Sequence, residues 1–290
     1  MRITIKLMLI LALVSTPAVA ANLFVPTQFG TIQAAVDAAS PGDRILVAAG
    51  MYDGALITKR VKIAGEGNQT VIINGPTGQS SPSFFQNGFE LSSGADGTTI
   101  SDLRIDLDPG SVDVLGGVVL VQVGIFGVGV DRVAVHDVEL IGLNGGIDFR
   151  SSHKWRIIDN TIEGLNSVEF PGFVRRAIGI RVVESSGSLI AFNTITHDGS
   201  SDDNTNKRYR GIELIFRFPD RIPVVNNKLI QNEIAIVAPG ASEVTDIRLI
   251  DVPAFFGGPV VEIFNNKLIQ NEADPIVIQP ELLIDHNVIQ

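Results

Sequence analysis

Three charged residues occupy the same position of a short motif and form the strongest candidate site. The motif reads glycine, apolar, any residue, apolar, and it supplies Asp148 in GIDF, Arg181 in GIRV and Glu213 in GIEL. In a β-strand the apolar residues would point inward and the residue between them outward to solvent. Neighbouring strands lie about 4.8 Å apart, so successive motifs would stack these side chains as a carboxylate–guanidinium–carboxylate column. The column could be catalytic, or it could be an ion-pair ladder that only keeps the sheet surface soluble.

A long polar segment beside the third motif adds further candidates. The segment Thr196–Arg210 reads THDGSSDDNTNKRYR and would lie next to the column as a loop. The residues that we expect to bind substrate are Arg150, Arg208, Tyr209 and Arg210. Asp202 and Asp203 in the same loop offer oxygen ligands of the kind that calcium prefers. A calcium site and two solvated loop residues are both left open for this pair.

The column depends on a repeat that recurs along most of the chain. An octapeptide, NNKLIQNE, occurs at Asn226–Glu233 and again at Asn265–Glu272. A looser template of apolar, any, polar or Phe, Asn or apolar, any, apolar begins at Ile100, Val135, Ile157, Ile190, Val224, Ile263 and Ile284. We expect its asparagines to stack as one column of turn residues that bond from coil to coil; they are Asn160, Asn193, Asn227, Asn266 and Asn287. Further copies of the glycine motif are GFEL at Gly88, GIFG at Gly124 and, without glycine, EIAI at Glu233, which would add Ala235 to the column.

Both motifs alternate apolar and polar residues with a period of two, which is the strand period. Short strands repeated this regularly predict a β-solenoid, in which each coil completes the core of its neighbour. Near the start, TIQAAVDAA at residues 31–39 has helical spacing and is followed by the stop signal SPGD, so it predicts a helix that caps the first coil. The chain ends one residue after a template copy. We therefore expect the final coil to be covered, either by the segment 239–259 or by self-association with a second molecule.

Composition and the first twenty residues bear on location and partners. Residues 1–20 combine Arg2 and Lys6, a short apolar stretch and the small-residue pattern Ala18-Val19-Ala20, so they predict a signal peptide cleaved near Ala20 and a secreted or periplasmic protein. Cleavage would change the net charge from −10 to −12, because both lost charges are cationic. An acidic chain argues against nucleic acid as a partner, and no later apolar run predicts membrane insertion. Since the chain has no cysteine, disulfides are excluded.

The segment TIQAAVDAASPGDRILVAAGMYDGALITKRVKIAGEG resembles the opening of pectin-lyase-like β-helix proteins. The resemblance includes the helix, the Pro-Gly-Asp stop and the Gly-x-Tyr turn at Gly50–Tyr52. It implies an all-β, right-handed parallel β-helix over residues 21–290, with an N-terminal capping helix. This superfamily contains lyases, hydrolases, esterases, epimerases and non-catalytic binders, so the fold does not choose the function. The motifs of its pectin methylesterases, polygalacturonases and C5-epimerases do not occur here, so no catalytic residue is carried over.

The sequence leaves three functional hypotheses open. The first is an extracytoplasmic protein that binds or acts on acidic polysaccharide, by β-elimination if it is an enzyme. Arg181, with Arg208 or Arg210, would then neutralise the substrate carboxylate, while Asp148 and Glu213 hold calcium or act as acid and base. The second is a glycoside hydrolase that uses these two carboxylates at a separation of about 9–10 Å. The third is a non-catalytic adhesion or structural solenoid.

Overall fold

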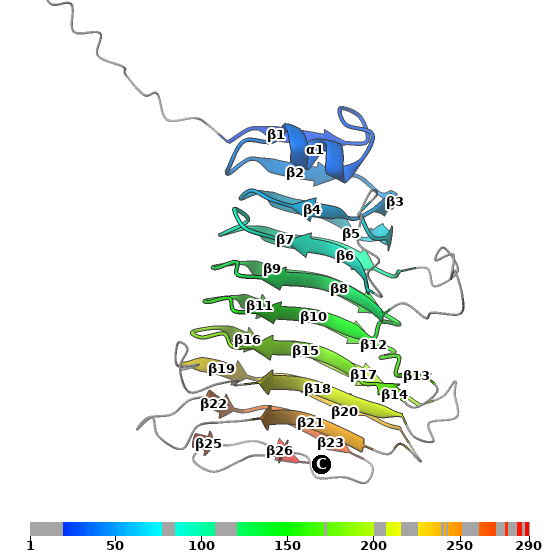
Figure 1. The fold of residues 1–290 in the computed structure, drawn as a ribbon, viewed down its shortest axis with the longest axis vertical. Helices are drawn as coiled ribbons and strands as arrows, with labels where there is room; N and C mark the ends of the chain where they lie inside the picture. Colours follow the sequence, from blue (N-terminus) through cyan, green and yellow to red (C-terminus); the bar gives the residue numbers. More distant parts are fainter. Residues whose placement is uncertain are drawn as a thin grey trace, which may run out of the picture.

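The computed structural model describes residues 20–76, 85–107, 121–170, 173–199, 207–215, 226–238, 241, 243–250, 261–270, 276–277, 283–285 and 288–289. These residues form a right-handed parallel β-helix whose coils stack along one long axis from the N-terminus to the C-terminus (Figure 1). The described residues contain no helix that is long and apolar enough to cross a membrane.

Two parallel sheets form the walls of the solenoid. The larger, 16-stranded sheet bends into two flanks that are joined through its long strands β5, β7 and β9. Its first flank contains β1 (Asn22–Val25), β2 (Arg44–Val47), β5 (Lys62–Asn74), β7 (Thr99–Ile105), β9 (Ala134–Ile141), β11 (Arg156–Ile158), β16 (Leu189–Ala191), β19 (Asn227–Ile230), β22 (Val261–Phe264) and β25 (Leu283–Asp285). Its second flank adds β3 (Gly50–Asp53), β12 (Thr161–Glu163), β17 (Thr194–His197), β20 (Glu233–Ile236), β23 (Lys267–Gln270) and β26 (Val288–Ile289).

The 8-stranded sheet carries the glycine motifs and hence the candidate site. Its strands are β4 (Ala55–Ile57), β6 (Phe85–Leu91), β8 (Val121–Val128), β10 (Gly145–Arg150), β15 (Ala177–Val183), β18 (Arg208–Ile215), β21 (Glu243–Ile250) and β24 (Ile276–Val277). A separate antiparallel pair, β13 (Val168–Phe170) and β14 (Phe173–Arg175), lies between β12 and β15 in the chain.

A helix stands at the N-terminal end, as the spacing in TIQAAVDAA predicts. Helix α1 (Ile32–Ala38) begins after Thr31, whose side-chain oxygen accepts a hydrogen bond from the Ala34 backbone N–H at 3.1 Å. Its apolar face, with Ile32, Ala35 and Val36, is buried against the solenoid. The helix is confirmed, while its role as a cap remains a prediction.

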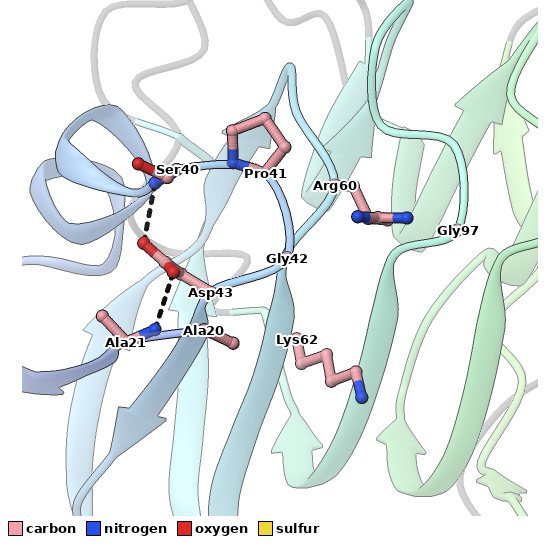
Figure 2. A pocket seen from close by; sticks show the side chains of 9 residues that line it. All are labelled: Ala20, Ala21, Ser40, Pro41, Gly42, Asp43, Arg60, Lys62 and Gly97. Atoms are coloured by element: carbon pink, nitrogen blue, oxygen red, sulfur yellow. Dashed lines mark hydrogen bonds between the residues drawn. The ribbon is translucent and has the colours of Figure 1, made fainter. Parts of the chain in front are cut away.

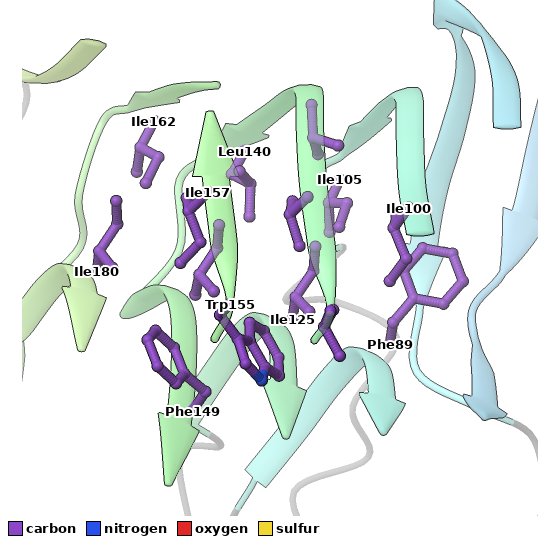
Figure 3. Packing of buried hydrophobic residues seen from close by; sticks show 14 of the residues in the cluster. Phe89, Ile100, Ile105, Ile125, Leu140, Phe149, Trp155, Ile157, Ile162 and Ile180 are labelled. Atoms are coloured by element: carbon purple, nitrogen blue, oxygen red, sulfur yellow. The ribbon is translucent and has the colours of Figure 1, made fainter. Parts of the chain in front are cut away.

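Stacked apolar side chains fill the interior between the two sheets (Figure 3). The single tryptophan, Trp155, stacks on Phe149 with ring centroids 4.6 Å apart, and its indole N–H donates to the Val130 carbonyl at 2.7 Å. The aromatic pair thus fills the core without leaving the buried indole donor unsatisfied.

The octapeptide repeat does not mark equivalent places in successive coils. Its first copy forms β19, which pairs with β22, whereas its second copy forms β23, which pairs with β20. Leu229 therefore takes the template position that we assigned to Val224, opposite Ile190 and Ile263. The assignment was wrong because the segment LIQNEI also fits the template, and only pairing across coils distinguishes the two phases.

The asparagine column is confirmed, with one member exchanged. It runs Asn160, Asn193, Asn232, Asn266, and each side-chain oxygen after the first accepts both the backbone N–H and the side-chain N–H of the preceding asparagine. Asn227 instead belongs to another turn, where it accepts from the Ser188 backbone N–H at 2.9 Å. Asn287 lies outside the described residues. The left-handed backbone belongs to the residue just before each asparagine, at Asp159, Phe192, Gln231 and Asn265.

The glycines of the glycine motif stack so closely that a side chain does not fit. A Cβ atom at Gly179 would lie 2.7 Å from the Gly211 carbonyl oxygen and 2.8 Å from Ile195 Cγ2. Gly146 and Gly211 show the same approach to a backbone oxygen of the next coil, at 2.4 and 2.6 Å. Glycine at this position therefore allows successive coils of this sheet to approach one another closely.

We expect Gly179→Ala to lower the free energy of unfolding by about 1–3 kcal/mol, because the added methyl group overpacks two fixed neighbours. Urea unfolding would measure the loss. The matched control is Gly30→Ala, where a Cβ atom would have nothing within 4 Å and little change is expected. Equal midpoints for the two variants would contradict this explanation of the motif.

Two expectations about the C-terminal coils are wrong. The segment EIAI is β20 of the larger sheet, so Ala235 does not extend the charged column. Within the segment 239–259, residues Glu243–Ile250 form β21, a wall strand between β18 and β24, and do not fold back as a cover. Its phenylalanines, Phe255 and Phe256, lie outside the described residues, and self-association at the final coil remains a prediction.

Candidate functional site

The three motif residues lie in register on adjacent strands of the 8-stranded sheet. Asp148 of β10 pairs with Arg181 of β15, which pairs with Glu213 of β18. Arg181 contacts both acids, with its Nη1 atom 3.6 Å from Asp148 Oδ2 and its Nε atom 3.3 Å from Glu213 Oε2. The predicted column is therefore confirmed as an arrangement.

The column continues at both ends. Phe126 of β8 precedes Asp148, and Arg248 of β21 follows Glu213 in the same register. Arg248 was missed because its motif reads DIRL, in which Asp246 replaces the glycine. The likeness of its Ile-Arg-Leu to the Ile-Arg-Val of the Arg181 motif was the sequence signal that could have identified Arg248.

The expectation that the two acids face solvent is wrong. The side chains of Asp148 and Glu213 are only 5% and 2% exposed, although they alternate with interior residues such as Phe149 and Leu214. They therefore lie on the outer side of the strands, beneath arginines. A strand pattern predicts which way a side chain points, but it does not predict what covers it.

Arg150 covers the Asp148 end of the column. Its guanidinium donates to both oxygens of Asp148, from Nε at 3.0 Å and from Nη2 at 2.6 Å, and it lies 5.2 Å from the centre of the Phe126 ring. The hydrogen bond to Asp148 raises the pKa of Arg150 more than burial lowers it. The Arg150 side chain remains 34% exposed, and its role in substrate binding stays a prediction.

The Glu213 end is built around a second carboxylate, Glu243 of β21, which sequence reasoning missed. Glu243 contacts Arg210 and Arg248, and Arg176 lies 3.8 Å away. Arg208 is its register partner on β18. Burial, and then the charges of Arg176 and Arg208, lower the pKa of Arg248. Because one acid is surrounded by several arginines, this end of the column is positively charged.

Two of the residues that we expected to bind substrate are buried. Arg210 is 1% exposed and links Glu213 to Glu243, so it positions these acids and does not reach the surface. Tyr209 is also 1% exposed and stacks on His197 at 4.3 Å between ring centroids, inside the solenoid. Both lie on strand β18 instead of the expected loop. Their burial depends on the packing of neighbouring coils, which the local sequence does not show. Arg208 is half-buried, and its predicted role in binding remains open.

The charges of this group do not balance. The named cluster, which we call the arginine face, contains six arginines and three carboxylates: Arg150, Arg176, Arg181, Arg208, Arg210, Arg248, Asp148, Glu213 and Glu243. A chain with a net charge of −10 thus concentrates positive charge on one sheet. Asp148, Glu213 and Arg210 are buried, whereas the other five arginines and Glu243 reach solvent. The groups offered to solvent are therefore mainly guanidinium groups, which suit carboxylate ligands.

A metal site receives no support from the described part of the chain, where no group of three His, Cys, Asp or Glu side chains could hold an ion. Asp202 and Asp203 lie outside the described residues, so calcium at this pair remains a prediction.

Known proteins resemble this chain in structure but not in sequence. No protein-family model matches it, and no curated protein matches it significantly. The A-module of the mannuronan C-5 epimerase AlgE6 of Azotobacter vinelandii superposes with a TM-score of 0.52 at 17% identity, covering 84% of this chain and 67% of that one. An alginate lyase from Paenibacillus sp. gives 0.52 at 14% identity, covering 93% and 95%, and the rice weevil pectin methyl esterase gives 0.59 at 14%, covering 95% and 91%. At such identities the likeness shows the shared parallel β-helix fold.

Proposed function

We propose that this protein works outside the cytoplasm and binds an acidic polysaccharide along the arginine face. The observation that carries the proposal is the excess of arginines over carboxylates on one sheet of an otherwise acidic chain. A uronate polymer presents regularly spaced carboxylates, and a guanidinium can bind each with two hydrogen bonds. The structurally similar epimerase, lyase and esterase are named for mannuronan, alginate and pectin, which makes this ligand class the first to test.

Arg181 is central to the proposed binding, because its side chain is 19% exposed between two buried acids. We expect Arg181→Gln to weaken binding to polygalacturonate or alginate about tenfold, the loss of roughly one charge-assisted contact. Affinity electrophoresis or calorimetry at low salt would measure it. Binding should also weaken as ionic strength rises.

The matched control removes the same charge elsewhere. Arg156 is exposed on β11, in the other sheet, so Arg156→Gln should leave affinity unchanged. A thermal scan shows whether Arg181→Gln stays folded. Equal affinity of the two variants, or equal binding to a neutral dextran, would refute the proposal and favour a solenoid with another partner.

β-Elimination is a second candidate, favoured by the contact of Arg181 with carboxylates on both sides. The reaction needs a cation at the substrate carboxylate and a base for the neighbouring ring proton. Arg181 would supply the cation, and an acid of the arginine face the base. An increase in ultraviolet absorbance on polyuronates, with and without calcium, would support it; no increase would remove the lyase but leave the binding proposal intact.

Hydrolysis by Asp148 and Glu213 fits the geometry less well. Inverting hydrolysis needs one carboxyl group at the leaving oxygen and another at a water molecule. Each of these acids is buried and already engaged by two arginines. New reducing ends without ultraviolet-absorbing product would nevertheless establish it.

A further inference from the structure

A buried carboxylate holds the chain at the predicted cleavage point. Asp43, which is 7% exposed, accepts the Ser40 backbone N–H on Oδ2 and the Ala21 backbone N–H on Oδ1, each at 2.8 Å (Figure 2). Ala21 is the residue that would follow the cleavage pattern Ala18-Val19-Ala20. The acid of the helix-stop signal therefore meets the nitrogen that cleavage would release.

The position of Ala21 is fixed from both of its main-chain groups. Its carbonyl oxygen accepts the Arg44 backbone N–H at 2.8 Å, and from Asn22 onward β1 pairs with β2. Because β2 and Asp43 adjoin in the chain, one segment holds both the oxygen and the nitrogen of Ala21. The nitrogen cannot move far from Asp43 while β1 stays paired.

Asp43 is the acid with which an added cation at Ala21 would pair, in a pocket whose other charged residues are cationic. Ala20, Ala21 and Asp43 line a pocket of about 500 Å³ together with Arg60 and Lys62 (Figure 2). Arg44 is the register partner of Lys62 on β2. Asp43 is the one carboxylate among the pocket-lining residues, so it alone can offset a new positive charge there.

We propose that removal of the leader creates an Ala21 ammonium group that pairs with Asp43 and thereby strengthens the first coil. Water cleaves the Ala20–Ala21 peptide bond; its hydroxyl goes to the Ala20 carbonyl carbon and a proton goes to the Ala21 nitrogen, which takes up a second proton from solvent. A neutral amide donor thus becomes a charged one at the same acceptor. The hydrogen bond to the Asp43 carboxylate then also becomes an ion pair, so Coulomb attraction between opposite charges adds to it.

A double-mutant cycle on the full mature chain tests the pair. It compares protein beginning at Ala21 with protein that keeps Ala20 preceded by a glycine, each with and without Asp43→Asn. The substitution disturbs the Ser40 contact equally in both forms. We expect it to lower the thermal midpoint by about 2–4 °C more in the form beginning at Ala21. Equal losses in the two forms would overturn the proposal.

Amine labelling decides the matter even if Asp43→Asn does not fold. In the wild-type protein beginning at Ala21, the α-amino group should be acetylated about tenfold more slowly than in the extended form, because the paired ammonium resists deprotonation. Lysine labelling serves as the internal reference. Equal rates, or an exported protein whose first residue by mass spectrometry is not Ala21, would each overturn the inference.

Discussion

Replacing Arg210 by methionine is expected to lower the free energy of unfolding by about 3–5 kcal/mol, one of the largest effects in this protein. The Arg210 guanidinium is 1% exposed and contacts both Glu213 and Glu243. Methionine fills much of the volume but leaves Glu213 buried with one arginine fewer. Urea unfolding followed by circular dichroism would measure the change.

Arg248→Met is the matched control, because Arg248 contacts the same Glu243 but its side chain is 27% exposed. A pair open to solvent contributes little, so its loss should cost under about 1 kcal/mol. Adding Glu213→Gln to Arg210→Met should restore part of the stability by removing the buried charge. Equal losses from the two arginine variants would show that burial does not set the strength of this cluster.

Asn193→Ala is expected to destabilise the protein by about 3–5 kcal/mol, because it interrupts the buried asparagine column. The Asn193 side-chain oxygen accepts the backbone N–H of Asn160 at 3.1 Å, and its amide donates to the Ile157 carbonyl at 2.9 Å. Alanine would leave both backbone groups buried without these partners. Thermal and urea unfolding would report the loss.

Asn226→Gly is the control for this second prediction. Asn226 is an exposed turn residue with a φ of 63°, a conformation that glycine adopts without strain. We expect its replacement to change stability by less than about 0.5 kcal/mol. If Asn193→Ala cost no more than this, the column would be a consequence of the stacking and not a support for it.

Local patterns carried most of the fold prediction. Period-two alternation predicted the strands, helical spacing predicted α1, and the repeated asparagines predicted a bonded column. The alternation and the helical spacing depend on neighbours within a few residues, and the asparagine column on the recurrence of one template. The structure confirms each, with Asn232 in place of Asn227 in the column. The octapeptide did not mark equivalent positions in successive coils, because the loops between repeats differ in length. Its two identical copies therefore form strands at different positions of the coil.

The site was only partly predictable from the sequence, because pairing between coils brings together residues that share no local motif. The shared position of Asp148, Arg181 and Glu213 in one motif correctly placed them side by side, since strand register preserves motif position. Glu243 and Arg248 lay in a segment without the motif glycine. Only the likeness of Ile-Arg-Leu to the Arg181 motif pointed to Arg248, and no local feature marked Glu243 as a neighbour of Glu213. Their place follows from the pairing of β21 with β18, which only the stacked coils establish.

By itself, the sequence determined that this chain is a solenoid of short parallel strands and that three charged residues share one face, because alternation and motif position are local properties. Only the tertiary structure decided that Asp148 and Glu213 lie beneath arginines, that Tyr209 and Arg210 are buried, and that Asp43 meets Ala21. Burial and charge balance depend on which side chains from neighbouring coils converge. That convergence is set by packing between residues roughly 20 to 40 positions apart in this chain, as in the hydrogen bonds Ala21–Asp43 and Asn193–Asn232.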